Sequence, residues 1–183
     1  GGDTTGAAIF SSLNPNGFGG ANRQGVVIYL TDTGLIQFRL GLNSGYAGAL
    51  NSTSGALVTG TWKHVVCTYD GTTQRIYING VAAGTLATSA AGTGWLPNSQ
   101  AITRLGGTVL NGSATYAPVL TRPAILGANS YAGNRGYDGL MDEVAVYGTV
   151  LTASKIAAHY QAATTNNAGY SAQILADAPL AYW

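Results

Sequence analysis

Two pairs of turn-forming residues, Asp70-Gly71 and Asn79-Gly80, divide residues 62–88 into three short segments rich in β-branched and aromatic side chains. Asp-Gly and Asn-Gly are the strongest short-range hairpin signals, because the favoured two-residue turn requires positive φ at both of its central residues. Residues 62–69, 74–78 and 81–88 are therefore predicted to form three antiparallel strands that are joined by tight turns.

Further strands are expected over residues 7–12, 25–31 and 35–42, and again over residues 124–127 and 137–147. The pattern is clearest in the third of these segments, where apolar side chains alternate with polar side chains or glycine. Such alternation buries one face of a strand and leaves the other face in water. The apolar set consists of Ile36, Phe38, Leu40 and Leu42.

Two other segments do not have the strand pattern. Residues 89–122 are rich in Gly, Ser, Asn and Thr and are expected to form a long irregular connection. Thr152 is a suitable N-cap for a helix over residues 153–163, in which Ile156 and Tyr160 lie on one face. The chain is thus predicted to be mostly β, with one helix near its C-terminal end.

The composition excludes several classes of partner. Charged residues make up only 8% of the 183 residues and the net charge is +1, so neither nucleic acid nor an anionic membrane is an expected partner. No apolar run approaches the roughly 18 residues that a membrane-spanning helix needs. The single cysteine, Cys67, excludes an intrachain disulfide.

Two long motifs resemble the laminin-G-like, or concanavalin A-like, jelly-roll domains of bacterial surface proteins. The first is W-x-H-V-x-x-T-Y-D-G at residues 62–71, followed by Y-x-N-G at 77–80. The second is G-x-x-D-E-V-x-x-Y at residues 139–147, which precedes the expected helix. The resemblance covers roughly residues 20–163. It implies an all-β, two-sheet antiparallel jelly-roll sandwich with one short C-terminal helix, at the cell surface or outside the cell.

The same resemblance implies an unusual organisation of the chain. Residues 1–163 are expected to form one jelly roll that lacks its own first strands, and residues 164–169 are expected to form a linker. Residues 170–183 resemble the opening strand of the next repeat. The terminal part of this segment is expected to pair as a strand, either within the chain or in a neighbouring copy.

The residues that hydrolases use are not arranged for catalysis. Related jelly-roll glucanases use two carboxylates on one strand face, which flank the bond to be cleaved. Glu143 is the only glutamate, and the adjacent Asp142 is expected to point to the opposite face. His64 and Cys67 are three residues apart on one predicted strand and also face opposite ways, while His159 is expected on the helix surface. The chain is therefore not expected to be an enzyme.

Asp142 is a candidate cation ligand, because it shares the parity of the apolar residues expected to face the core. A buried carboxylate needs a partner, and concanavalin A-like domains often hold calcium near this strand, which binds oxygen ligands. The other candidate calcium ligands are Asn129 and Asp138, with Asp70 as a further auxiliary. The alternative is a hydrogen bond to a backbone amide, or an ion pair with Arg104 or Arg122.

Exposed aromatic side chains can stack on the apolar faces of sugar rings. The candidates in or beside the long irregular segment are Trp95, Tyr116, Tyr131 and Tyr137. Trp62 begins a strand of the family motif and is expected in the core instead.

The predicted function is a non-catalytic recognition or adhesion repeat of a larger extracellular protein, with a glycan or a cell-surface or matrix molecule as its ligand. The alternative is a structural spacer or filament-forming repeat, which assembles with neighbouring copies by exchange of the terminal strand.

Overall fold

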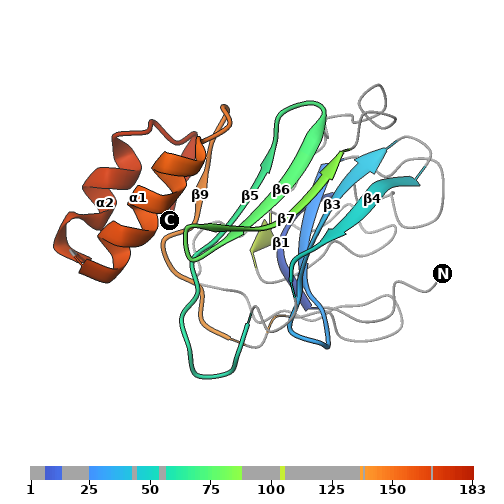
Figure 1. Cartoon of the computed structure of the whole chain (residues 1–183), viewed down its shortest axis with the longest axis horizontal. Helices are drawn as coiled ribbons and strands as arrows, with labels where there is room; N and C mark the ends of the chain where they lie inside the picture. Colours follow the sequence, from blue (N-terminus) through green and yellow to red (C-terminus); the bar gives the residue numbers. More distant parts are fainter. Residues whose placement is uncertain are drawn as a thin grey trace, which may run out of the picture.

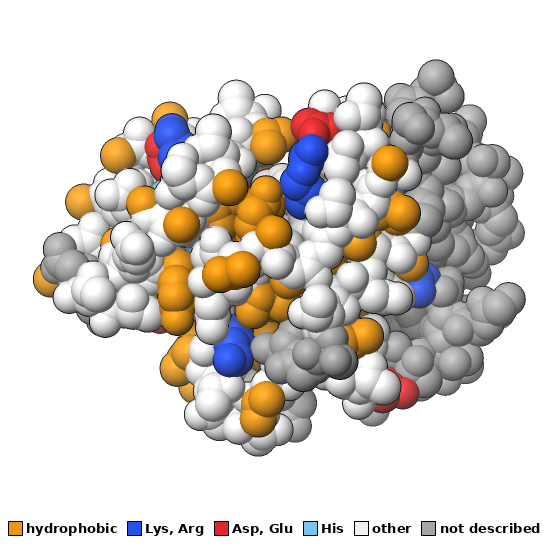
Figure 2. Space-filling model, in the orientation of Figure 1, with side chains coloured by type: hydrophobic (Ala, Val, Ile, Leu, Met, Phe, Trp, Pro, Cys, Tyr) orange, Lys and Arg blue, Asp and Glu red, His pale blue; other side chains and the backbone are white. Residues whose placement is uncertain are grey.

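The computed structural model describes residues 7–13, 25–42, 45–53, 57–87, 104–105, 137, 139–165 and 167–183. The described residues form three layers, which are two main β-sheets and a pair of helices, with a further two-stranded sheet (Figure 1). The visible face of the molecule carries few charged side chains, in keeping with the low charge of the sequence (Figure 2).

The first layer is a five-stranded antiparallel sheet with the order β4-β3-β2-β1-β8. Its strands are β1 (Ala7–Leu13), β2 (Gly25–Leu30), β3 (Ile36–Leu42), β4 (Gly45–Asn51) and β8 (Arg104–Leu105). The first three strands lie where the sequence predicts them. β4 was not predicted from the sequence, while the expected strand over residues 124–127 lies outside the described residues.

The second layer is a three-stranded antiparallel sheet formed by β5 (Val65–Tyr69), β6 (Thr73–Ile78) and β7 (Val81–Ala87). Both predicted hairpins are confirmed. Asn79 and Gly80 have φ values of 52° and 78°, and they connect the paired residues Ile78 and Val81 in a two-residue turn.

The other hairpin turn is longer and is organised by the side chain of Asp70. The Asp70 carboxylate accepts hydrogen bonds from the Thr72 and Thr73 amides and from the Arg75 guanidinium. The Arg75 guanidinium, followed by the Thr72 amide, lowers the pKa of Asp70 well below its ordinary value. Asp70 is therefore held by the turn of its own hairpin, which argues against its role as an auxiliary cation ligand.

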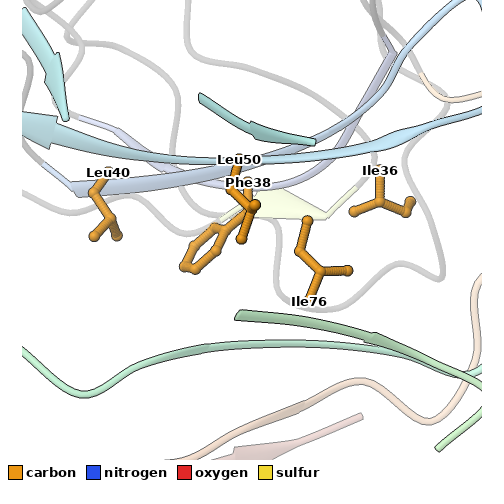
Figure 3. Close-up of a cluster of buried hydrophobic side chains, with 5 residues drawn as sticks. All are labelled: Ile36, Phe38, Leu40, Leu50 and Ile76. Atoms are coloured by element: carbon orange, nitrogen blue, oxygen red, sulfur yellow. The ribbon is translucent and has the colours of Figure 1, made fainter. Parts of the chain in front are cut away.

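The main core lies between the two sheets (Figure 3). Alternate residues of β3 point from the first sheet toward β6, and Ile76 points back toward them from the second sheet. This arrangement follows from the period-two pattern of β3. The buried cluster comprises Ile36, Phe38, Leu40, Leu50 and Ile76, each no more than 6% exposed.

Polar contacts also connect the two sheets. The fully buried side chain of Gln74 in β6 donates from Nε2 to the Phe38 carbonyl of β3 over 3.2 Å. The Thr53 amide, which follows β4, donates to the Ala83 carbonyl of β7 over 3.0 Å. Buried polar groups need such partners, so these contacts help to fix how one sheet lies on the other.

The third layer is formed by α1 (Ala153–Thr165) and α2 (Asn167–Leu175). Thr152 caps α1 as predicted, because its Oγ1 accepts the Lys155 amide. Ile156 of α1 packs with Leu151 and Tyr77. Since Tyr77 alternates with the core residue Ile76 along β6, α1 covers the outer face of the three-stranded sheet. Neither described helix has both the length and the apolar character to cross a membrane.

The expectations for the C-terminal segment need correction. Residues 164–169 are not a linker, because α1 continues to Thr165 and α2 begins at Asn167. The first part of residues 170–183 is the remainder of α2 and not a strand. The end of the segment forms β10 (Ala181–Tyr182), which pairs with β9 (Ala145–Val146) of the same chain. The end of the chain thus pairs with an earlier segment of the same chain, but β10 joins neither of the two main sheets and does not fill a strand position in the jelly roll.

Gly80 is expected to be hard to replace, because α1 passes directly over it. A Cβ at Gly80 would lie 3.2 Å from the Ala157 Cα and 3.2 Å from the Tyr160 Cβ. Gly60 has almost the same φ, 80° against 78°, but has nothing within 4 Å of the corresponding position. Gly60→Ala should cost about 1–2 kcal/mol for the left-handed backbone, and Gly80→Ala about 1–3 kcal/mol more. Urea unfolding of the two variants measures the difference, and equal costs would contradict the close contact with α1.

Candidate functional site

The segment that carries Asp142 and Glu143 is not the continuous strand expected over residues 137–147. Glu143 has a φ of 55°, which interrupts an extended backbone, and strand pairing is confined to β9. The expected alternation is therefore wrong here. Asp142 is exposed, and Leu140, which shares its parity, is 76% exposed.

The two adjacent carboxylates have different environments. Asp142 turns back on the chain, and its Oδ1 accepts the Glu143 amide over 2.9 Å. Glu143 Oε2 is buried and has no partner among the described residues. Burial, and then the nearby charge of Asp142, raises the pKa of Glu143. A glycosidase places two carboxyl groups on either side of one substrate bond, and this arrangement does not resemble such a pair.

The described part of the candidate calcium site does not form a metal site by itself. Asp142 makes the hydrogen bond that the alternative reading required, and no group of three His, Cys, Asp or Glu residues among the described residues is placed to hold a metal ion. Asn129 and Asp138 lie outside the described residues. Calcium binding at this site stays a prediction.

His159 is buried, contrary to the surface position expected for it. Its side chain is 2% exposed, and Nε2 lies 2.8 Å from Oδ2 of Asp177. Asp177 also accepts a hydrogen bond from Lys155, and this bond is the main reason why the pKa of Asp177 is lowered. This cluster connects α1 to the segment between α2 and β10, so it holds the helical layer together.

His64 and Cys67 face opposite sides of the three-stranded sheet, as expected, because His64 lies near Tyr160 of α1 and Cys67 packs against the core between the two sheets. His64 is half-buried just before β5, and its ring centroid is 6.2 Å from that of Tyr160. Burial raises the pKa of the Cys67 thiol to about 12. A thiol with so high a pKa is almost entirely protonated at neutral pH, so Cys67 is not an activated nucleophile.

Only one of the predicted sugar-binding aromatics lies in the described part of the chain. Tyr137 is half-buried, and its ring packs directly against Gly139. The other three candidates are Trp95, Tyr116 and Tyr131, which lie outside the described residues. The proposed ligand-binding role of all four therefore stays a prediction.

Trp62 is not in the core, and this is the clearest correction to the expected site. Its side chain is 65% exposed, and it lies before β5, which begins only at Val65. Val58, in the same connection between β4 and β5, is 56% exposed. The family motif places Trp62 next to a strand, but nothing in the sequence shows that this end of the motif faces solvent.

The comparison with protein-family models agrees with the architecture. A laminin G family model, described as the concanavalin A-like lectin/glucanases superfamily, matches residues 2–120. No curated protein matches the chain. Among solved structures, the chain is similar to an S-layer domain-containing protein from Clostridium thermocellum, with 24% sequence identity and a TM-score of 0.35. That match covers 87% of this chain and 65% of the other, so this chain spans less than two thirds of the other's length.

Proposed function

The chain belongs to the concanavalin A-like lectin/glucanase superfamily, and we propose that it is a non-catalytic, glycan-binding domain of a larger extracellular surface protein. The superfamily includes both lectins and glucanases, so the question is which of the two activities the residues favour. The fold alone does not decide it, because one fold can carry many functions.

The main support for a non-catalytic domain is the environment of Glu143, which is the only glutamate of the chain. Glu143 has a buried Oε2, whereas the carboxylate of the neighbouring Asp142 is exposed and bonded to the backbone. The two carboxylates thus do not flank a common space in which a glycosidic bond would lie. Cys67, with its raised pKa, offers no alternative nucleophile. Binding of a sugar without cleavage is the activity that these residues favour.

A glycan array and a reducing-sugar assay test this proposal together. We expect the protein to be retained by a subset of glycans and to release no reducing sugar from β-glucans, galactans or host glycans. Glu143→Gln should change neither result, because Glu143 has no catalytic role. Turnover that is lost in Glu143→Gln would contradict the proposal, as would failure to bind any glycan.

We also propose that Asp142, Asn129 and Asp138 bind calcium, and the same array tests this proposal. If calcium supports binding, a chelator should reduce retention and added calcium should restore it. Retention that is unchanged by chelator would remove calcium from the proposal and leave glycan binding intact.

The alternative function, assembly by strand exchange, would require β10 to leave its pairing with β9, and no described contact favours that step.

A further inference from the structure

The loop of residues 57–64, called here the Trp62 loop, presents two large apolar side chains to solvent. Trp62 is 65% exposed and Val58 is 56% exposed. We propose that the Trp62 loop binds a pyranose that carries a carboxylate, with the sugar ring stacked on Trp62 and its carboxylate paired with Lys63. The inference rests on the proposed glycan-binding function, and it names a site and a class of sugar.

The loop is held in place on both sides of Trp62. The Thr61 amide and Oγ1 both donate to the Val58 carbonyl, over 3.2 and 2.8 Å, which closes a turn. The Leu57 amide donates to the Gly34 carbonyl over 3.1 Å, and the His64 amide donates to Oδ1 of Asn79 over 3.1 Å. A surface that is ordered before binding loses less conformational entropy when a ligand arrives.

Trp62 offers the chemistry that a sugar ring requires. The indole provides a large flat apolar surface with a polar N–H at its edge. One face of a pyranose is largely C–H groups, while its hydroxyls remain at the rim. Stacking therefore covers apolar surface on both molecules without burying the hydroxyls. The hydroxyl-bearing Thr59 and the exposed Thr61 lie beside Trp62 in the same loop and provide polar groups at its margin.

Lys63 determines the class of sugar. It is the only lysine or arginine of the Trp62 loop, and it makes no ion pair with any residue that the structure describes. A lysine that has no ion pair among the described residues and directly follows an exposed tryptophan favours a ligand that is apolar on one face and anionic at its edge.

The size of the patch argues against a folded protein as the occupant. A stable protein interface covers about 800 Å² on each partner and has several buried anchors. The Trp62 loop supplies one aromatic anchor and one smaller apolar side chain. One exposed aromatic side chain is enough to stack a single sugar residue, whereas a protein partner would need further apolar surface around the loop.

Isothermal titration of the whole chain with trigalacturonic acid, sialyllactose and the neutral sugar lactose tests the inference. We expect at least one of the two carboxylated sugars to bind several-fold more tightly than lactose, and this preference to shrink as salt is raised. The two acidic probes distinguish a uronic acid from a sialic acid. Equal affinity for acidic and neutral sugars would overturn the assignment of a carboxylated ligand.

Variants of the Trp62 loop locate the site. Trp62→Ala should weaken binding about tenfold or more, Trp62→Tyr should weaken it less, and Lys63→Gln should remove the preference for acidic sugars. Val81→Ala, which removes another exposed apolar side chain, is the matched control and should bind like the parent. Circular dichroism checks that each variant is folded.

The failure of this inference is distinguishable from the failure of the proposed function. If the parent and Trp62→Ala bind glycans equally well, the domain is a glycan-binding module whose site lies elsewhere. If the parent binds no glycan on the array, both proposals are wrong. If Trp62→Ala changes only the sedimentation of the protein, Trp62 is a contact between proteins, and the sugar site is overturned.

Discussion

Replacement of Leu40 by alanine is expected to lower the free energy of unfolding by about 2–5 kcal/mol, because it opens a cavity between the two sheets. Leu40 is 2% exposed and belongs to the cluster that β3, β4 and β6 share. The lost stability combines the transfer of the leucine side chain to water with the contacts that its neighbours lose around the cavity. Urea denaturation followed by circular dichroism measures this effect.

Leu140→Ala is the matched control, since it makes the same chemical change at a site that is 76% exposed. It should alter the free energy of unfolding by no more than about 0.5 kcal/mol. The control also tests the corrected description of residues 139–147, because the sequence pattern had placed Leu140 on the core side of a strand. Equal losses in the two variants would show that Leu140 is buried after all.

The strands and hairpins of the two sheets were predictable because their signals are local. In β3 the alternation of apolar and polar side chains sets which face is buried, and Asn79-Gly80 sets the turn between β6 and β7. Each signal depends on only a few neighbouring residues, so the structure it predicts does not depend on contacts with distant parts of the chain. The two long family motifs then indicated how the strands combine into a sandwich.

The errors arose where a distant partner decides the outcome. His159 lies three residues after Ile156, so it shares the buried face of α1, but its burial also depends on Asp177 in a later segment. The helix α2 did have a local signal, since Tyr170 and Ile174 are four residues apart and both are buried. That spacing was outweighed by the resemblance of residues 170–183 to an opening strand.

The candidate site was less predictable than the fold, and Trp62 and Glu143 show why. A motif records which residue types recur, but it does not show at which residue the next strand begins. Here β5 begins only at Val65, and Trp62, three residues earlier, is exposed to solvent. The positive φ of Glu143 reverses which side chains face the core, and no glycine or asparagine at that position announces it. Binding residues on connections are set by such details of the backbone.

Protonation of His64 in the unfolded chain is expected to lower the free energy of unfolding by about 3 kcal/mol between pH 7 and pH 4. Burial, and then the nearby His159, lowers the pKa of His64 in the folded protein to about 4. An unfolded histidine has a pKa of about 6.5. Between these two values the unfolded state binds more protons than the folded state, so the free energy of unfolding decreases as the pH is lowered.

His64→Phe tests the assignment, because phenylalanine keeps a ring beside Tyr160 and does not titrate. The variant should lose most of the decrease between pH 6.5 and pH 4. Asp70 and Asp177 have lowered pKa values, so the stability that they contribute is present above the ordinary aspartate pKa of about 3.9 and is lost only as the pH falls below it. The raised pKa of Glu143 acts in the opposite direction, because the folded state then binds more protons than the unfolded state as the pH falls. The decrease between pH 6.5 and pH 4 is therefore assigned to histidine. Leu40→Ala should shift the whole pH curve downward without changing its shape, whereas a His64→Phe curve parallel to that of the parent would place the responsible proton on another group.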